Sequence, residues 1–240
     1  MELLALGVGY QVYKAIRKSA APEAGPALEH ALDIVRWERA VGLFQEGWAQ
    51  RQLLAHPWFL QAADLYYGTV HFVAPVLVLI ALYRTAPARY RCWRTVLVLT
   101  TAGALIGFKW YPLAPPRLLP DAFHFVDTVA RFGGEGVLNN GDMKDVDNLY
   151  AAMPSLHMAW STWCALAAWP LAPRWWTKAI LVLYPTLTLI VVVVTANHFV
   201  LDAVGGWILL ALSWVLVTVV GRVRTSARLR AVAGEDLIYG

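Results

Sequence analysis

The sequence predicts an all-α integral membrane protein, a helical bundle of about six transmembrane helices with an N-terminal amphipathic helix. Of its 240 residues, 59% are hydrophobic and only 15% are charged, and the mean hydropathy is +0.51. Soluble domains carry about 25% charged residues, so this composition indicates a chain that is dissolved in lipid. Three stretches without any Asp, Glu, Lys or Arg approach the roughly 20 residues that cross the hydrocarbon. They are Leu65–Tyr83, Ser155–Pro173 and Ala179–Ala196.

Two other apolar runs carry one charge each, Lys109 within Thr95–Pro116 and Asp202 within Phe199–Gly221. Together with the charge-free stretches, they predict a series of long helices joined by short loops and by one long polar connection. The expected helices cover residues 57–83, 92–112, 154–171, 175–195 and 198–221. The expected domains are an N-terminal part with a helix and an amphipathic helix (1–54), a transmembrane part (55–221) and a basic cytoplasmic tail (222–240).

The net charge of +4 does not indicate a nucleic-acid partner, because the basic residues gather at the ends of the apolar runs. The clusters lie within residues 84–94, 174–178 and 222–230. Basic clusters at alternate helix ends follow the positive-inside rule, which places them in the cytoplasm. We therefore expect a multi-pass protein of the cell membrane, with the polar connection Arg117–Met153 on the outer, extracytoplasmic face.

Two segments precede the bundle. Residues 1–20 predict a short retained helix, because their positive charges follow the apolar stretch and do not precede it as in a signal peptide. The segment Leu28–Leu54 has helical periodicity but too many charges for a lipid-facing span, so it is either an interfacial helix or one packed inside the bundle. Its charged residues Glu38, Arg39 and Glu46 are candidates to line a substrate entrance. Its apolar face is expected to contain Leu32, Val35, Ala40, Leu43, Phe44 and Trp48.

The stretch NHFVLD carries a paired histidine and aspartate. His198 and Asp202 are four residues apart, which on a helix places both side chains on one face. An ionised Asp202 that accepts the Nδ1 proton of His198 leaves Nε2 free as a nucleophile or base. A structural His–Asp pair is the alternative, but ionisable residues inside a membrane span are costly and are usually functional. We therefore predict that the pair is catalytic.

The stretch FKWYPLAPPRLLP carries two cations on a bend. Its prolines prevent a regular helix between Lys109 and Arg117, because each ring removes a donor and disturbs the preceding turn. Either cation alone suits a snorkelling residue at a helix end. Near a His–Asp pair, the two together predict a clamp for a phosphate, in which Arg117 offers a planar fork and Lys109 a point charge.

The stretch PSLH opens the next apolar run. Pro154 suits the first turn of a helix, and Ser155 lies where free N–H groups and the helix dipole favour an anion. His157 is then placed to donate a proton to a leaving group. The predicted topology brings this histidine, the two cations and the His–Asp pair to the same outer surface, which favours a single active site.

At these residues the sequence resembles the type 2 phosphatidic acid phosphatase (PAP2) superfamily, whose signature is a Lys–Arg motif, then Pro-Ser-x-His, then His-x-x-x-Asp. The resemblance spans roughly residues 60–221, and PLAPPRL, NHFVLD and YYGTVHF are most similar to the inositol phosphorylceramide synthase-like branch. It implies a six-helix membrane fold and phosphoryl transfer without a metal or another cofactor. The roles it implies are attack on phosphorus by His198, orientation by Asp202, protonation of the leaving oxygen by His157, and phosphate binding by Lys109, Arg117 and Ser155.

Two departures from the family pattern bear on the phosphate site. Seven residues separate Lys109 from Arg117 where the family has six, and Pro116 precedes the arginine where the family has proline after it. Val191 and Val192 replace the usual Ser-Arg pair ahead of the nucleophilic histidine. One cation fewer disfavours a dianionic phosphate monoester, so the departures favour a phosphodiester or diphosphate lipid. The candidates to fill the gap are Asn197, which we take as a phosphate-binding residue, His71 and an N-terminal arginine.

The sequence thus predicts a membrane lipid phosphatase or phosphotransferase that cleaves or transfers a phosphate or phospho-head group through a phosphohistidine. The expected substrate is a phospholipid, sphingolipid or polyprenyl phosphate, and a polyprenyl (di)phosphate phosphatase is an alternative within the class. A proton-coupled transporter is the alternative of another class, but transporters usually carry repeated halves, and no repeat is visible here. His71, in mid-span, is interpreted as a core histidine, and Asp142, Asp145 and Asp147 as a solvated loop and not a metal site.

Overall fold

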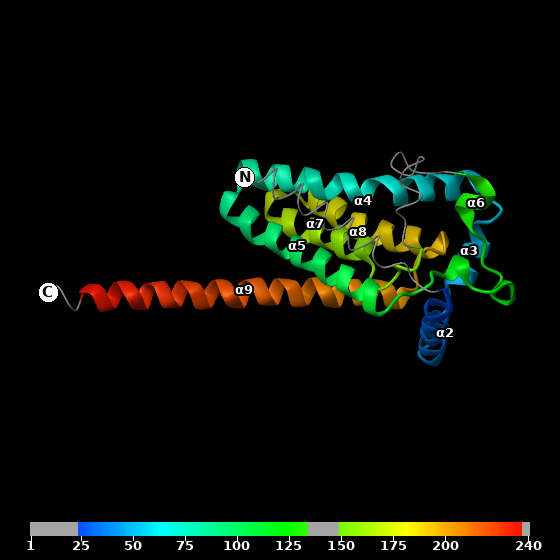
Figure 1. Cartoon of the computed structure of the whole chain (residues 1–240). Coiled ribbons are helices and arrows are strands. Elements are labelled where there is room, and N and C mark those ends of the chain that lie inside the picture. The colour runs from blue at the N-terminus through cyan, green and yellow to red at the C-terminus, as the bar shows by residue number, and fades with distance from the viewer. Residues whose placement is uncertain (1–23, 134–148, 237–240) are drawn as a thin grey trace.

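The chain folds into a bundle of long helices with shorter helices gathered at one end (Figure 1). The structure, a computed structural model, describes residues 24–133 and 149–236, and in this part all regular secondary structure is helical. The predicted helix within residues 1–20 and the aspartates at 142–147 lie outside the described residues. The long helices are α4 (Pro57–Thr85), α5 (Pro87–Trp110), α7 (Leu156–Ala168), α8 (Trp175–Val194) and α9 (Val200–Asp236). The shorter ones are α2 (Ala24–Ala40), α3 (Glu46–Leu53) and α6 (Thr128–Phe132), with the 3₁₀ turns η1 (Pro116–Leu118), η2 (Asp121–Phe123) and η4 (Trp169–Leu171).

Successive long helices run in alternating directions, so the connections fall at two opposite ends of the bundle (Figure 1). The guanidinium of Arg89 donates to the carbonyls of Leu166 (3.2 Å) and Ala167 (3.1 Å), which fixes the α4–α5 turn against the end of α7. The start of α8 and the extension of α9 lie at this same end. The three basic clusters therefore share one end of the bundle, as the predicted topology requires. Which end faces the cytoplasm stays a prediction.

Three helices in the described part are long and apolar enough to cross a membrane: α4, α8 and the first 25 residues of α9. Of the roughly six membrane spans expected, three are thus supported. The helix that covers the predicted span 154–171 is α7, but it has only 13 residues, or about 20 Å at 1.5 Å per residue. More than half of its residues are buried against its neighbours, so it is shielded by the bundle. The remaining long helix, α5, carries Arg89, Arg91, Arg94 and Lys109 near its two ends.

The charged segment 28–54 forms two helices, not one, because the chain turns between α2 and α3 at Gly42, whose φ is +74°. α2 lies across the end of the bundle and not within it (Figure 1). It is anchored there by the Ala27 carbonyl, which accepts from the Ala114 amide (3.0 Å), and by His30, which stacks on Tyr111. The predicted apolar face was partly wrong, because its residues are divided between α2, the turn and α3 and do not share one helix face. The buried side chains are Ala27, Ala31, Ile34, Val35 and Glu38, whereas Leu43 and Trp48 are exposed.

Exposed tryptophans mark both ends of the bundle. Tryptophan is favoured at the two membrane–water interfaces, where its ring meets the headgroups. Such residues lie at the starts of α4 and α8, at the end of α5, and on α2 and α3. The two groups are consistent with a bundle that crosses the bilayer along its long axis. They consist of Trp37, Trp48, Trp58 and Trp110 at one end and of Trp169, Trp175 and Trp176 at the other.

The orientation is tested by cysteine labelling at the two ends. In a chain with Cys92 and Cys164 replaced by alanine, Ala88→Cys marks the basic α4–α5 turn and Ala122→Cys marks η2; both positions are exposed. We expect a membrane-impermeant maleimide to label position 122 in intact cells and position 88 only after permeabilisation. The opposite pattern would overturn the outer-face assignment of the end that carries α2 and α3.

Candidate active site

The loop between α8 and α9 places His198. Its turn is tight: Ala196 adopts a positive φ of 54°, and the amides of Asn197 and His198 both donate to the Val192 carbonyl (3.0 and 3.1 Å). α9 begins only at Val200, so His198 precedes the helix. The expectation that His198 and Asp202 share one face of a helix is therefore wrong in its geometry, although the two side chains do meet.

Asp202 brings the pair together by folding back over the start of its own helix. Its Oδ2 accepts from His198 Nδ1 (3.2 Å) and from the backbone amide of Phe199 (2.9 Å). The second contact is half of a capping box, in which an acidic residue three positions into the helix satisfies the amide of the N-cap residue. Asp202 is fully buried and His198 is 3% exposed. A buried carboxylate held by two donors fixes the imidazole and its tautomer, with the proton on Nδ1 and the lone pair on Nε2.

His157 approaches the other nitrogen of His198. It lies in the first turn of α7, and its Nδ1 is 3.4 Å from His198 Nε2. Since His198 Nε2 carries the lone pair, the His157 nitrogen that faces it carries a proton. The site thus has a nucleophilic nitrogen and a proton donor directed at one another, and a substrate must enter between them.

Ser155 ties α7 to α9 and holds His157 in place. Its amide donates to the Asp202 carbonyl (2.9 Å), and its hydroxyl caps α7 by accepting from the Met158 amide (3.4 Å). The fully buried hydroxyl keeps its own proton for another acceptor. Glycine makes this contact possible, because a Cβ on Gly206 would lie 2.4 Å from the Ser155 carbonyl oxygen. Serine at this position is thus an N-cap, and its role as a phosphate ligand stays a prediction.

Two aromatic residues of α4 complete the wall behind His157. Tyr67 stacks on His157 with ring centroids 4.0 Å apart and an interplanar angle of 16°, and the His71 ring lies 4.0 Å from it on centroids. His71 is bonded through Nδ1 to the Tyr67 carbonyl (2.6 Å). This bond fits the interpretation of His71 as a core histidine with a satisfied ring nitrogen. Its ring, however, also contacts His157 of the site. In the sequence, His71 stands out through the stretch YYGTVHF, in which it follows Tyr67 by four residues.

Arg117 is joined to the His198 loop through its backbone. Its amide donates to the Ala196 carbonyl (3.0 Å), while its Nε lies 3.6 Å from Asp127 Oδ2. The guanidinium is partly exposed and remains accessible to an anion. Lys109, by contrast, has an exposed side chain on the last turn of α5, and no described contact brings it to the histidines. Its assignment as a phosphate ligand stays a prediction.

Asn197 is buried beside His198. Its Nδ2 donates to the hydroxyl of Thr195 (2.7 Å), and among the described residues none donates to its Oδ1. The amide group is therefore oriented by the loop itself. Within the same described part, no group of three or more His, Cys, Asp or Glu side chains is arranged to hold a metal ion.

Comparison with known proteins connects this geometry with one family. A family model described as the PAP2 superfamily matches residues 32–216, well over half of the chain. The match begins within α2 and includes α3 and all the residues of the site. Searches of curated proteins and of solved structures found no match.

The close approach of α7 and α9 is tested at Gly206. Gly206→Ala places a Cβ against the Ser155 backbone, which cannot move without moving His157, and we expect a loss of about 1–3 kcal/mol in stability, as is typical of overpacking. Gly221→Ala, in the same helix, is the matched control, since its Cβ would meet no heavy atom within 4 Å. Thermal unfolding in detergent measures both. Equal midpoints for the two variants would contradict the close-packing argument.

Proposed function

Because the chain belongs to the PAP2 superfamily, which consists generally of phosphatase-type enzymes, we propose that it is a membrane lipid phosphatase or phosphotransferase acting through a phosphohistidine. The observation that carries this proposal is the chain of contacts Asp202–His198–His157, with 3.2 Å at one nitrogen of His198 and 3.4 Å at the other. A nucleophile held by a buried carboxylate and faced by a proton donor is the arrangement that covalent catalysis needs.

In the first step the lone pair on His198 Nε2 attacks phosphorus, and the bond from phosphorus to the lipid oxygen breaks. The departing oxygen keeps the bonding electrons and takes the Nδ1 proton of His157, which enters this step as an imidazolium and leaves it neutral. Asp202 stabilises the positive charge that the His198 ring acquires, and it keeps Nδ1 protonated. The products of this step are a phosphohistidine and a lipid, or head group, that ends in a hydroxyl.

In the second step water or a lipid-borne alcohol attacks the phosphohistidine. His157, now neutral at Nδ1, takes the proton of the attacking oxygen, and the phosphorus–nitrogen bond breaks with its electrons returning to His198 Nε2. Water gives hydrolysis and an alcohol gives transfer. The likeness of PLAPPRL and NHFVLD to the inositol phosphorylceramide synthase-like branch supports transfer to an alcohol.

The phosphate oxygens are held, in this proposal, by Arg117, Ser155 and Asn197, with Lys109 at the rim. The missing family arginine leaves Val192, which is fully buried beside Met158 and Ala203. Val192→Arg would bury an unpaired charge in this apolar cluster, so that substitution is not a usable test of charge preference. We infer that the substrate phosphate is a diester or a diphosphate of a phospholipid, sphingolipid or polyprenyl lipid.

The catalytic roles are tested by separate substitutions of the two histidines. His198→Ala should abolish turnover and the formation of an acid-labile phosphoenzyme with labelled lipid. His157→Ala should slow release of a lipid alcohol by roughly 10²–10⁴-fold, but release of nitrophenol much less, because nitrophenolate leaves without a proton. Equal losses for both leaving groups would contradict an acid role for His157. Wild-type turnover should persist in EDTA, and restoration of an EDTA-abolished activity by a divalent ion would contradict the metal-free mechanism.

The charge preference is tested by direct competition in detergent. A monoester such as phosphatidic acid carries close to two charges near neutral pH and phosphatidylinositol carries one. One missing charge-assisted contact is worth about 1.5–3 kcal/mol, so we expect kcat/KM to favour phosphatidylinositol by roughly tenfold or more. A large preference for phosphatidic acid would overturn the inference, and a preference for an added polyprenyl diphosphate would select the second lipid class.

A further inference from the structure

Two carboxyl groups of the N-terminal helices are fully buried, that of Glu38 in α2 and that of Glu46 in α3, both at 0% exposure. Acidic side chains are almost never fully buried unless they are paired. The sequence alone offers these residues only as candidates to line a substrate entrance. Neither belongs to the motifs that place the histidines, so their burial next to the site calls for a reason.

Both glutamates bind the backbone that directly follows His198. Glu38 Oε1 accepts from the Leu201 amide (2.7 Å), and Glu46 Oε1 accepts from the Val200 amide (3.0 Å). With the Phe199 amide already bonded to Asp202, three successive amides at the start of α9 are each held by a carboxyl group. These are amides that a helix cannot satisfy internally, and they form the positive end of its dipole.

The second oxygen of each glutamate is buried as well. No donor in the described part of the chain is hydrogen-bonded to Glu38 Oε2 or to Glu46 Oε2. A side-chain hydrogen bond to Glu46 is among the causes that raise the pKa of Glu38, so the two carboxyl groups are close enough to bond to each other. Such a bond requires one proton, because two carboxylates have no donor between them. Burial, reinforced by Glu46, raises the pKa of Glu38 to about 9, so the proton is retained at neutral pH.

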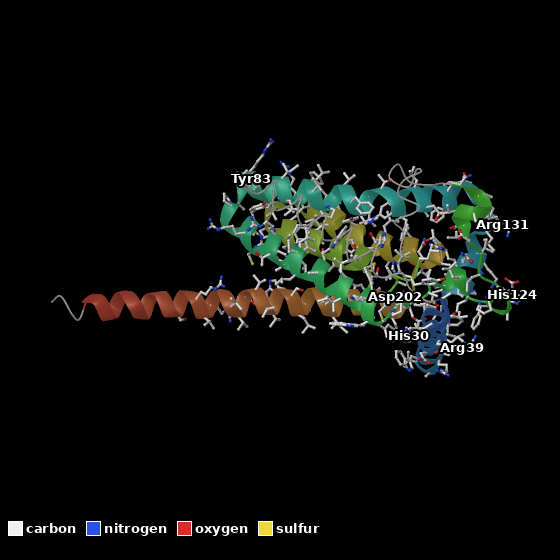
Figure 2. All side chains as sticks on the ribbon, viewed as in Figure 1. His30, Arg39, Tyr83, His124, Arg131 and Asp202 are labelled. Carbon is white, nitrogen blue, oxygen red and sulfur yellow. The ribbon has the colours of Figure 1, made fainter. Side chains whose placement is uncertain are left out.

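The other charged groups around the pair do not replace this proton. Asp202 of α9 faces the pair and adds to the negative charge there. The Arg39 guanidinium of α2 lies over the rings of Phe44 and Phe123, at 5.0 and 5.6 Å. Figure 2 shows Arg39 on α2 and Asp202 near the start of α9, at the same end of the bundle.

We propose that Glu38 and Glu46 are positioning residues for the nucleophile, which share one proton and hold the backbone of Val200 and Leu201 so that His198 stays between Asp202 and His157. The proposal rests on the proposed function, since it assigns His198 as the nucleophile. Its physical reason is that His198 lies before α9: its own amide bonds back to the Val192 carbonyl of α8, so the backbone on its α9 side needs acceptors from elsewhere. A displacement of about 1 Å at a reacting group can cost about a hundredfold in rate.

The test compares Glu38→Ala, Glu38→Gln and the control Glu29→Ala, which removes an exposed glutamate from the same helix. Glu38→Ala should lower kcat by about a hundredfold with a smaller change in KM, because the substrate contacts remain. Glu38→Gln should retain near wild-type kcat at pH 7. Its Oε1 accepts from Leu201, and its amide nitrogen donates permanently to Glu46, as the protonated glutamate does.

The pH profile separates positioning from simple stability. Because the folded-state pKa of Glu38 is above its ordinary 4.5, the stabilisation from the shared proton is complete below pH 4.5 and is lost as the pH rises through about 9. Glutamine cannot lose this proton. The ratio of Glu38→Gln to wild-type kcat should therefore rise with pH, by about fourfold at half a unit above that pKa. The ratio cancels the titration of the histidines, which both proteins share.

Three outcomes would overturn the proposal: a Glu38→Ala kcat equal to that of Glu29→Ala, a Glu38→Gln kcat as low as that of Glu38→Ala at pH 7, or a ratio that stays flat to pH 9.5. The last holds even where Glu38→Ala fails to fold. Phosphoenzyme formation by the wild type is measured first. Its absence counts against the proposed function, whereas its presence with any of the three outcomes counts against the positioning role alone.

Discussion

The amides that open α9 have no acceptor within the helix, and burial makes each of them require one. A buried amide left without a partner costs about 1–3 kcal/mol, and three of them in succession would leave this helix start unstable. Carboxyl groups from α2, α3 and α9 itself supply the acceptors. The same bonds hold the N-terminal helices across the end of the bundle and fix the backbone on which the active-site histidine sits. Fold and site therefore depend on one set of contacts.

Small residues let the helices approach closely enough for this arrangement. A Cβ on Gly107 of α5 would lie 2.7 Å from the Pro154 ring, and one on Gly206 of α9 would meet the Ser155 backbone. In lipid, helix association depends on packing and not on a hydrophobic driving force, so interfaces favour small residues. Here the closest packing lies at the start of α7. The distance between His157 and His198 is consequently set by backbone contact and not by flexible side chains.

The sequence predicted the helical class and the meeting of the histidines with Asp202, because both follow from local patterns: long apolar runs and short motifs. It predicted the wrong local geometry for His198, since four-residue spacing does not reveal whether a helix starts before or after the first residue. The burial of Glu38 and Glu46, and their bonds to the start of α9, could not be predicted from the sequence. Their partners are backbone amides more than 150 residues away, and such contacts leave no periodic signal in the sequence.

Because carboxyl groups already bind the first amides of α9, the positive charge that a phosphate needs has to come from another part of the site. A helix start commonly binds phosphate through free amides, but here carboxyl groups occupy them. In the proposed mechanism, the phosphate is therefore bound from the other side, by the start of α7 and by Arg117. That arginine is paired with Asp127, which at the same time caps α6 by accepting from the Ala130 amide. A partly exposed ion pair of this kind is worth at most about 1 kcal/mol, so a substrate phosphate competes easily with Asp127 for the guanidinium. If His198 is the nucleophile, as proposed, the strong contacts hold the backbone next to it, and the weak ion pair lies where the proposed substrate binds and leaves.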